Sequence, residues 1–404
     1  MNFIIYLSTE LLTKIIPFIS LLILAKYVDV SSFGELTLYF IIFEFLVIFV
    51  GNNISAVTRI DFFNLTKRSY RYTKTHHLIG SLFIFFIFGL CLFLFFDINQ
   101  EYILCLLIAS LMRTVSYYVL ADLQCNEKAT TYAIYNFTFI ISTNLSFMYL
   151  IINGYEIHSW FYSILFGSFM QFLLAIKYIK HNKILLFHTK FFISFSKIYK
   201  EFRNGIIFIP QAIGFWISVA TDRFLIAHFL GNLVVGYYMF VYRFATPIII
   251  LSSAINLYLT PKINKLLKTK ELEKLRKILF KFSILIIFLS ILNYLAIYFL
   301  INLYYQEYAI ALNYLSYIIV SLILQAIYLI YMNVFYYIGM KKFISKLIFI
   351  IAIIKVILVY FSIKYFGIDG LLNINIMINF IVLVFTVIKF QKELKKIKES
   401  NGIY

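Results

Sequence analysis

The feature that most constrains this chain is a succession of about twelve long apolar runs separated by short connections. Runs of about 20 apolar residues match the hydrocarbon thickness of a bilayer, and helices satisfy their own backbone hydrogen bonds there. Hydrophobic residues make up 63% of the chain and charged residues 13%, which is more apolar than soluble domains are. The sequence therefore predicts an all-α integral membrane protein. The runs lie roughly at residues 4–27, 33–57, 78–96, 103–124, 131–152, 159–179, 204–230, 234–260, 279–303, 309–338, 343–366 and 370–389.

The net charge of +18 has a topological explanation. In a soluble protein it would suggest a nucleic-acid partner. Here most of the 36 basic residues lie in the even-numbered connections and the C-terminal tail, whereas the odd-numbered connections carry mainly acidic residues. Cytoplasmic connections of membrane proteins are enriched in Lys and Arg. We therefore expect a multi-pass protein of the cytoplasmic (inner) membrane with both termini in the cytoplasm, and no nucleic-acid partner.

The longest basic connection divides the predicted helices into two sets of six. A weak internal repeat supports this division, because "LAKYVDVSSFGELTLYF" (24–40) resembles "IAHFLGNLVVGYYMFVY" (226–242), with Gly34 matching Gly236. Chance similarity of two glycine-containing hairpins is the alternative. Parallel repeats of this kind occur in transporter folds with a site at the repeat interface. The predicted parts are an N-terminal half (1–190), a C-terminal half (191–390), a basic cytoplasmic tail (391–404) and a central cavity between the halves.

Several function classes are disfavoured by what the sequence lacks. The connections are too short for a folded extramembrane domain, and no Walker-type loop is present. The three cysteines have no metal-ligand spacing. We therefore expect no enzymatic activity, no catalytic residues, no metal and no bound cofactor.

Charged residues inside apolar runs are the candidate functional residues, because each costs about 2.5–3.5 kcal/mol at the bilayer centre. The basic ones come from both halves and are candidate contacts for an anionic substrate: Lys14, Arg113, Arg223, Arg243 and Lys355. The acidic ones are candidate charge partners or ion-coupling carboxylates: Glu10, Glu44 and Asp222. Structural pairing, for example of Lys14 with Glu10 one helical turn away, is the alternative for each residue.

The stretch "NGIIFIPQAIGFWISVATDRFLIAHFLGNLVVGYYMFVYRFATP" (204–247) resembles the seventh and eighth helices of bacterial polysaccharide-export flippases. These are the O-antigen (Wzx-type) flippases of the multidrug/oligosaccharidyl-lipid/polysaccharide exporter superfamily. The residues that carry the resemblance are Pro210, Asp222, Arg223, Gly231, Gly236 and Tyr238. Three further segments are similar in the same order along the chain: "FGELTLY" (33–39), residues 305–342 and "YFGIDG" (365–370).

The resemblance implies a transporter that flips an undecaprenyl-diphosphate-linked oligosaccharide, such as an O-antigen or capsule repeat unit, from the inner to the outer leaflet. It further implies alternating access, coupling to an H⁺ or Na⁺ gradient, and a polysaccharide polymerase and chain-length regulator as protein partners. Only Asp222 and Arg223 match the motif; the other candidates rest on position. Two alternatives are a membrane polysaccharide polymerase and a drug or cation exporter of the same superfamily.

Overall fold

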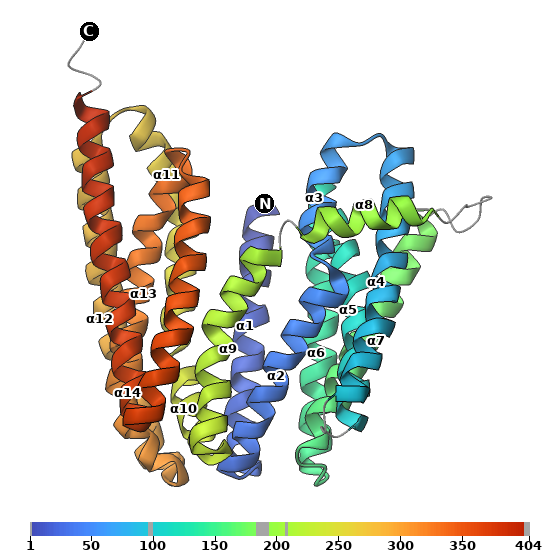
Figure 1. The fold of residues 1–404 in the computed structure, drawn as a ribbon, viewed down its shortest axis with the longest axis horizontal. Coiled ribbons are helices and arrows are strands. Elements are labelled where there is room, and N and C mark those ends of the chain that lie inside the picture. Colours follow the sequence, from blue (N-terminus) through green and yellow to red (C-terminus); the bar gives the residue numbers. More distant parts are fainter. Residues whose placement is uncertain (1, 96–99, 183–193, 207–208, 400–404) are drawn as a thin grey trace. The chain divides into compact units, whose positions relative to one another are not determined.

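The structure, a computed structural model, describes residues 2–95, 100–182, 194–206 and 209–399 (Figure 1). Within these ranges the regular elements are all helical. The chain forms two compact units. Unit 1 consists of Met1–Asp29 and Leu36–Ile213, and unit 2 consists of Val30–Glu35 and Gly214–Tyr404.

Unit 1 contains eight helices or the greater part of them. They are α1 (Asn2–Tyr27), α2 (Val30–Gly51), α3 (Ile54–Asn64), α4 (Lys67–Phe95), α5 (Gln100–Cys125), α6 (Ala129–Ile152), α7 (His158–His181) and α8 (Phe195–Ile206). The long helices α4 to α7 pack along one another, and the short α8 lies across α4 (Figure 1).

Unit 2 contains the rest of the helices together with the first turn of α2. They are α9 (Ile209–Leu230), α10 (Asn232–Ala245), α11 (Pro247–Lys268), α12 (Leu272–Tyr304), the 3₁₀-helix η1 (Gln306–Ala311), α13 (Leu312–Tyr337) and α14 (Lys341–Glu399). α14 packs along α13 and supplies one wall of the polar cavity described below.

The predicted membrane character of the chain is confirmed. Nine segments among the described residues are long and apolar enough to cross a bilayer. α12 displays this most clearly, because its large apolar side chains are exposed along its length, as at Phe280, Phe288 and Phe299. Exposed apolar surface on this scale is stable in lipid and not in water. The count of twelve crossings stays a prediction.

One of the nine segments, Lys346–Lys398, holds two helices rather than one. Gly367 interrupts α14 with a φ of 61° and a ψ of −146°, a backbone conformation that glycine adopts without steric cost. The chain turns there and runs back along itself (Figure 1). The separate runs predicted at 343–366 and 370–389 correspond to these two arms.

The predicted run 33–57 differs from the structure, because α2 ends at Gly51 and α3 begins at Ile54. Asn52 and Asn53 take left-handed φ values of 42° and 52°, which asparagine tolerates better than other residues with a Cβ. The break is where α8 packs: the Asn52 amide donates a hydrogen bond to the carbonyl of Phe202 at 3.1 Å. α8 itself was not predicted; the predicted run 204–230 includes its last residues, and the rest of that run corresponds to α9.

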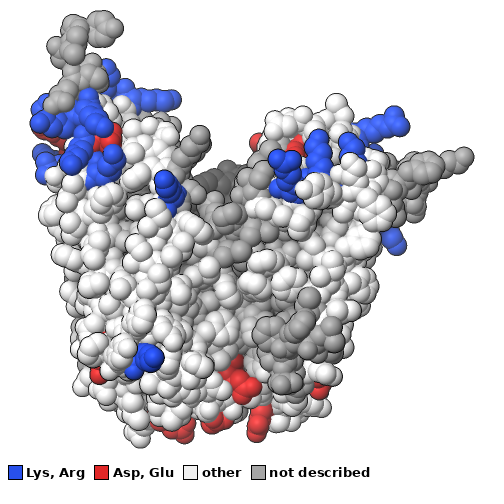
Figure 2. Space-filling view, in the orientation of Figure 1, with Lys and Arg blue, Asp and Glu red and all other residues white. Residues whose placement is uncertain are grey.

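Charged residues mark the two ends of each unit (Figure 2). In unit 1 the exposed Lys67 begins α4, the exposed Lys200 lies on α8, and the exposed Glu101 lies in the first turn of α5. In unit 2 the exposed Lys265 lies in the last turn of α11, the exposed Lys277 lies near the start of α12, and the exposed Asp369 lies beside the Gly367 turn of α14. This distribution is typical of bundles whose apolar middle faces lipid.

Two polar cavities as candidate functional sites

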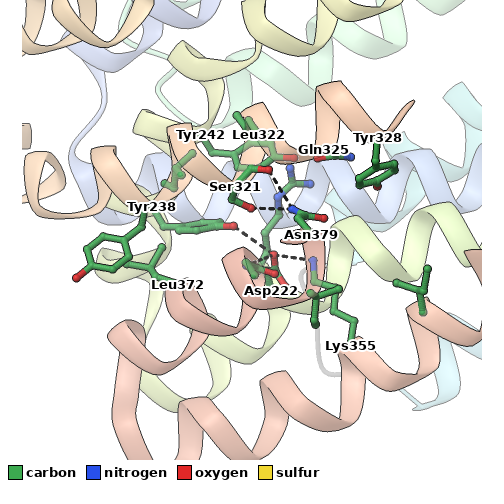
Figure 3. Close-up of a pocket in the computed structure, with 16 residues that line it drawn as sticks. Asp222, Tyr238, Tyr242, Ser321, Leu322, Gln325, Tyr328, Lys355, Leu372 and Asn379 are labelled. Carbon is green, nitrogen blue, oxygen red and sulfur yellow. Dashed lines mark hydrogen bonds and ion pairs between the residues drawn. The ribbon is translucent and has the colours of Figure 1, made fainter. Parts of the chain in front are cut away.

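Each unit contains a cavity that is lined by charged and polar side chains. The cavity of unit 2 is formed by α9, α10, α13 and α14 and has a volume of about 80 Å³ (Figure 3). The cavity of unit 1 is formed by α1, α3, α5 and α6 and has a volume of about 400 Å³. The two cavities therefore suit ligands of different size. The smaller admits a few water molecules or an ion, and the larger has a volume in the range of organic ligand sites.

Asp222 is the centre of the unit 2 cavity. Its Oδ2 forms a salt bridge with Lys355 Nζ at 3.0 Å (Figure 3). The same oxygen accepts hydrogen bonds from Asn375 Nδ2 at 3.0 Å and from the Tyr238 hydroxyl at 3.2 Å. Its Oδ1 is buried and has no hydrogen-bond partner among the described residues. The carboxylate therefore ties three helices together through one oxygen and keeps the other available.

Arg223 lines the same cavity and has a different environment from its neighbour in sequence. Its side chain is only 5% exposed. Its Nε donates to the sulfur of Met239 at 2.9 Å, a weak acceptor, and its Cζ lies 5.4 Å from the centre of the Tyr242 ring. Among the described residues Arg223 forms no salt bridge with a carboxylate. The guanidinium is thus held mainly by soft and aromatic groups.

Arg113, on α5, is the buried cation of the unit 1 cavity and is 7% exposed. One terminal nitrogen donates to Gln171 Oε1, and the other donates to the Tyr117 hydroxyl at 2.7 Å. Its Cζ lies 3.7 Å from the Phe139 ring centre and 4.4 Å from the Tyr117 ring centre. No carboxylate forms a salt bridge with Arg113 in the part of the chain that the structure describes.

The position of Arg113 is fixed by a second residue that sequence reasoning missed. Gln171, on α7, is fully buried, and its Nε2 donates to the Tyr135 carbonyl at 2.9 Å. That bond orients the amide so that its oxygen faces Arg113. A second basic residue, Arg59 of α3, lines the same cavity and donates to Gln124 Oε1 at 3.1 Å. The sequence analysis counted Arg59 only among the basic residues of the cytoplasmic connections.

The remaining predicted residues lie elsewhere. Glu44 is exposed on α2, and neither cavity is lined by it or by Arg243, which lies in the last turn of α10. The side chains of Glu10 and Lys14, on α1, lie outside the described residues. The structure thus brings Asp222, Arg223 and Lys355 together, and places Arg113 in the other cavity. Which of them contact a substrate stays a prediction.

A third polar cluster lies under α8 in unit 1. The fully buried Lys74 forms a salt bridge with Asp61 at 2.6 Å. Glu201 of α8 is 5% exposed and close enough to Lys74 to interact with it electrostatically. Burial raises the pKa of Glu201 above its ordinary value. This cluster joins α8 to α3 and α4 and borders neither cavity.

No family model matches the chain. A curated relative is an uncharacterized membrane protein of Haemophilus influenzae, 27% identical over 276 residues. The alignment covers 65% of each chain, so it spans less than two thirds of the relative.

Solved structures match over nearly the whole chain. The lipid II flippase MurJ in an inward closed conformation gives a TM-score of 0.75 at 16% identity, over 97% of this chain and 90% of that one. The inward-facing conformation of a multidrug resistance MATE family transporter gives 0.70 at 14% identity, over 97% and 96%. The chain has the MATE and MurJ fold. A mutant of the Vibrio cholerae MATE transporter VcmN shares this fold with a TM-score of 0.58 at 14% identity, over 98% and 94%.

Proposed function

We propose that the chain is a transporter that flips a lipid-diphosphate-linked oligosaccharide from the inner to the outer leaflet of the bacterial cytoplasmic membrane by alternating access. The observation that carries the proposal is the environment of Arg113: a buried guanidinium in a cavity of about 400 Å³, with no carboxylate bound among the described residues. Such a cation is stable only if an anion or a network of polar groups compensates it.

The shape of the Arg113 environment suits a phosphate group. The guanidinium carbon lies close to the Phe139 and Tyr117 rings, and Gln171 and Tyr117 accept only two of the five N–H donors of the guanidinium. The planar fork of arginine matches phosphate oxygens. Arg59 adds a second cation to the lining, and a diphosphate carries charge for two cations. The cavity also offers amides and phenol rings, as at Asn136 and Tyr132, which are groups that bind sugar hydroxyls and stack on sugar rings.

The comparisons support a transporter and fit this substrate class. One structural neighbour is a flippase for lipid II, and others are multidrug transporters. A drug or cation exporter is the alternative with the same fold. It would require acidic groups for cationic substrates, whereas the ionisable groups that line the unit 1 cavity are arginines and a tyrosine pair. A polysaccharide polymerase is disfavoured because the fold neighbours are transporters.

Coupling to an H⁺ or Na⁺ gradient is proposed to involve Asp222. Its buried Oδ1 has no partner in the part of the chain that the structure describes and can accept a proton or a cation, while Lys355 already compensates the charge at Oδ2. The unit 2 cavity is too small for a diphosphate-linked sugar. We therefore assign the head group to the Arg113 cavity and coupling to Asp222.

The test is deletion of the gene followed by complementation. The deletion strain is expected to lack surface polysaccharide and to accumulate lipid-linked repeat units on the cytoplasmic face of the membrane. Arg113→Ala should fail to restore export although the protein inserts at the normal level. Arg113→Lys should restore little, because lysine keeps the charge but loses the planar fork.

The matched control is Arg68→Ala, because Arg68 is an exposed basic residue at the end of unit 1 and lines neither cavity. It should complement fully. Normal surface polysaccharide in the deletion strain would contradict the flippase proposal. Resistance to cationic dyes on overexpression, with unchanged polysaccharide, would favour the drug exporter.

A further inference from the structure

The charges that line the unit 2 cavity do not balance. Among the side chains that the structure describes, the ionisable lining residues apart from tyrosines are Asp222, Arg223 and Lys355, which sum to one net positive charge. Asp222 and Arg223 are each 5% exposed, and the Lys355 side chain is 13% exposed. An excess charge enclosed to this degree is costly unless a counter-ion compensates it.

The imbalance falls on Arg223 rather than on Lys355. The salt bridge between Lys355 and Asp222 uses Oδ2, which also accepts from Asn375 and Tyr238. Among the described residues, Arg223 contacts only a thioether and an aromatic ring as partners for its charge. Its terminal nitrogens therefore donate to no described residue, and the side chain lines the cavity.

The rest of the lining supplies donors of the kind that anions bind. Hydroxyl and amide groups from α10 and α13 face the cavity, as at Tyr242, Ser321 and Gln325 (Figure 3). The volume of about 80 Å³ admits one small ion with a few water molecules and no organic ligand. The net positive charge, the hydrogen-bond donors and the small volume all favour a small anion as the ligand.

We propose that the unit 2 cavity binds a small inorganic anion, with chloride as the cellular species of suitable charge, held by Arg223 and the donor groups around it. This site is centred on Arg223 and shares the unit 2 cavity with Asp222, the proposed coupling carboxylate. It is separate from the head-group site assigned to Arg113, and its ligand belongs to a different class. It does not depend on which molecule the protein exports.

The experiment measures binding on the purified full-length protein in detergent. The protein is transferred to a gluconate buffer, and chloride replaces gluconate at constant ionic strength. Chloride should raise the thermal midpoint of unfolding with a saturating dose response, and bromide should do the same. Arg223→Gln should raise the half-saturating chloride concentration by about tenfold or more, because one charge-assisted hydrogen bond is lost.

Arg276→Gln is the matched control, since Arg276 is exposed on α12 and does not line the cavity. It should keep the wild-type chloride response. A second measurement on the wild type guards against a variant that folds poorly: anomalous diffraction from crystals grown in bromide should place a peak beside the Arg223 guanidinium.

Two outcomes would overturn the proposal. One is a stability that does not respond to chloride or bromide, with no anomalous peak in the cavity. The other is saturable stabilisation by inorganic phosphate or methyl phosphate but not by halides, which would make the cavity a phosphate subsite. Neither readout involves export, so a failure here is distinguishable from a failure of the proposed flippase activity.

Discussion

Gly34 and Gly236 each lie against a backbone carbonyl of the other's helix where α2 crosses α10. A Cβ built on Gly34 would lie 2.1 Å from the carbonyl oxygen of Asn232, and a Cβ built on Gly236 would lie 2.0 Å from that of Val30. The two contacts are reciprocal, and the same offset of 202 residues relates both glycines and both carbonyls. The two copies of the repeat therefore pack against each other at this crossing. Small residues permit such a close approach between helices in membranes.

We predict that Gly34→Ala and Gly236→Ala each destabilise the protein by about 1–3 kcal/mol or more, because backbone must move to admit the methyl group. Alanine otherwise favours helix over glycine by about 1 kcal/mol, so the sign is diagnostic. Gly89→Ala is the control, since its Cβ would lie 3.6 Å from Leu107 and fit. Thermal unfolding in detergent measures the effect. Equal stability of all three variants would contradict the close crossing.

The sequence predicted the long apolar helices because an apolar run marks each of them. It also matched Gly34 with Gly236, and the structure explains why both are glycine. It could not predict α8, because a short amphipathic helix has no apolar run. Nor could it predict the break at Asn52 and Asn53, because packing against α8 decides that conformation.

Residues far apart in sequence account for what sequence reasoning missed in the sites. Lys355 was singled out as an embedded cation, but its pairing with Asp222 joins residues 133 positions apart and follows only from tertiary packing. The contact between Gln171 and Arg113 also follows only from tertiary packing. A lone glutamine in an apolar run does not indicate which arginine it will orient. Arg223 and Arg113 looked alike in sequence and lie in cavities that differ fivefold in volume.

The Asp222–Lys355 salt bridge predicts a strong thermodynamic coupling. Asp222→Asn leaves a largely enclosed ammonium without its carboxylate, and Lys355→Met leaves a buried carboxylate without its ammonium. Each should cost about 3–5 kcal/mol of stability. The double variant Asp222→Asn with Lys355→Met removes both charges and should cost much less than the sum. Denaturation midpoints in a double-mutant cycle measure the coupling, and additive effects would show that the two residues do not interact.

Two glutamates outside the candidate membrane spans should affect the stability of the protein with opposite sign as the pH rises. Burial raises the pKa of Glu201 above 4.5 in the folded protein. The unfolded state then ionises first as the pH rises, so ionisation destabilises the fold above about pH 4.5. Glu201→Gln should therefore be more stable than the wild type at pH 7 and equal to it below about pH 4.

The comparison residue is Glu271, between α11 and α12. A hydrogen bond from Lys274 lowers its pKa below 4.5, so its contribution is present above that pH and is lost as the pH falls through the folded pKa. Glu271→Gln should be slightly less stable than the wild type at pH 7. The measurement is thermal stability in detergent from pH 4 to 8. The same sign for both variants would contradict these assignments.

α8 should lie in the interface between lipid head groups and acyl chains. Phe195 and Tyr199 are 72% and 68% exposed, and with Phe202 and Ile206 they form one apolar stripe at helical spacing. In a chain whose native tryptophans are replaced by phenylalanine, Tyr199→Trp should be quenched most by lipids brominated near the glycerol end of the acyl chains. Phe288→Trp, on the exposed face of α12, is the comparison and should be quenched most by lipids brominated deeper in the chains. A Trp at position 199 that neither lipid quenches would show that protein, not lipid, covers this stripe.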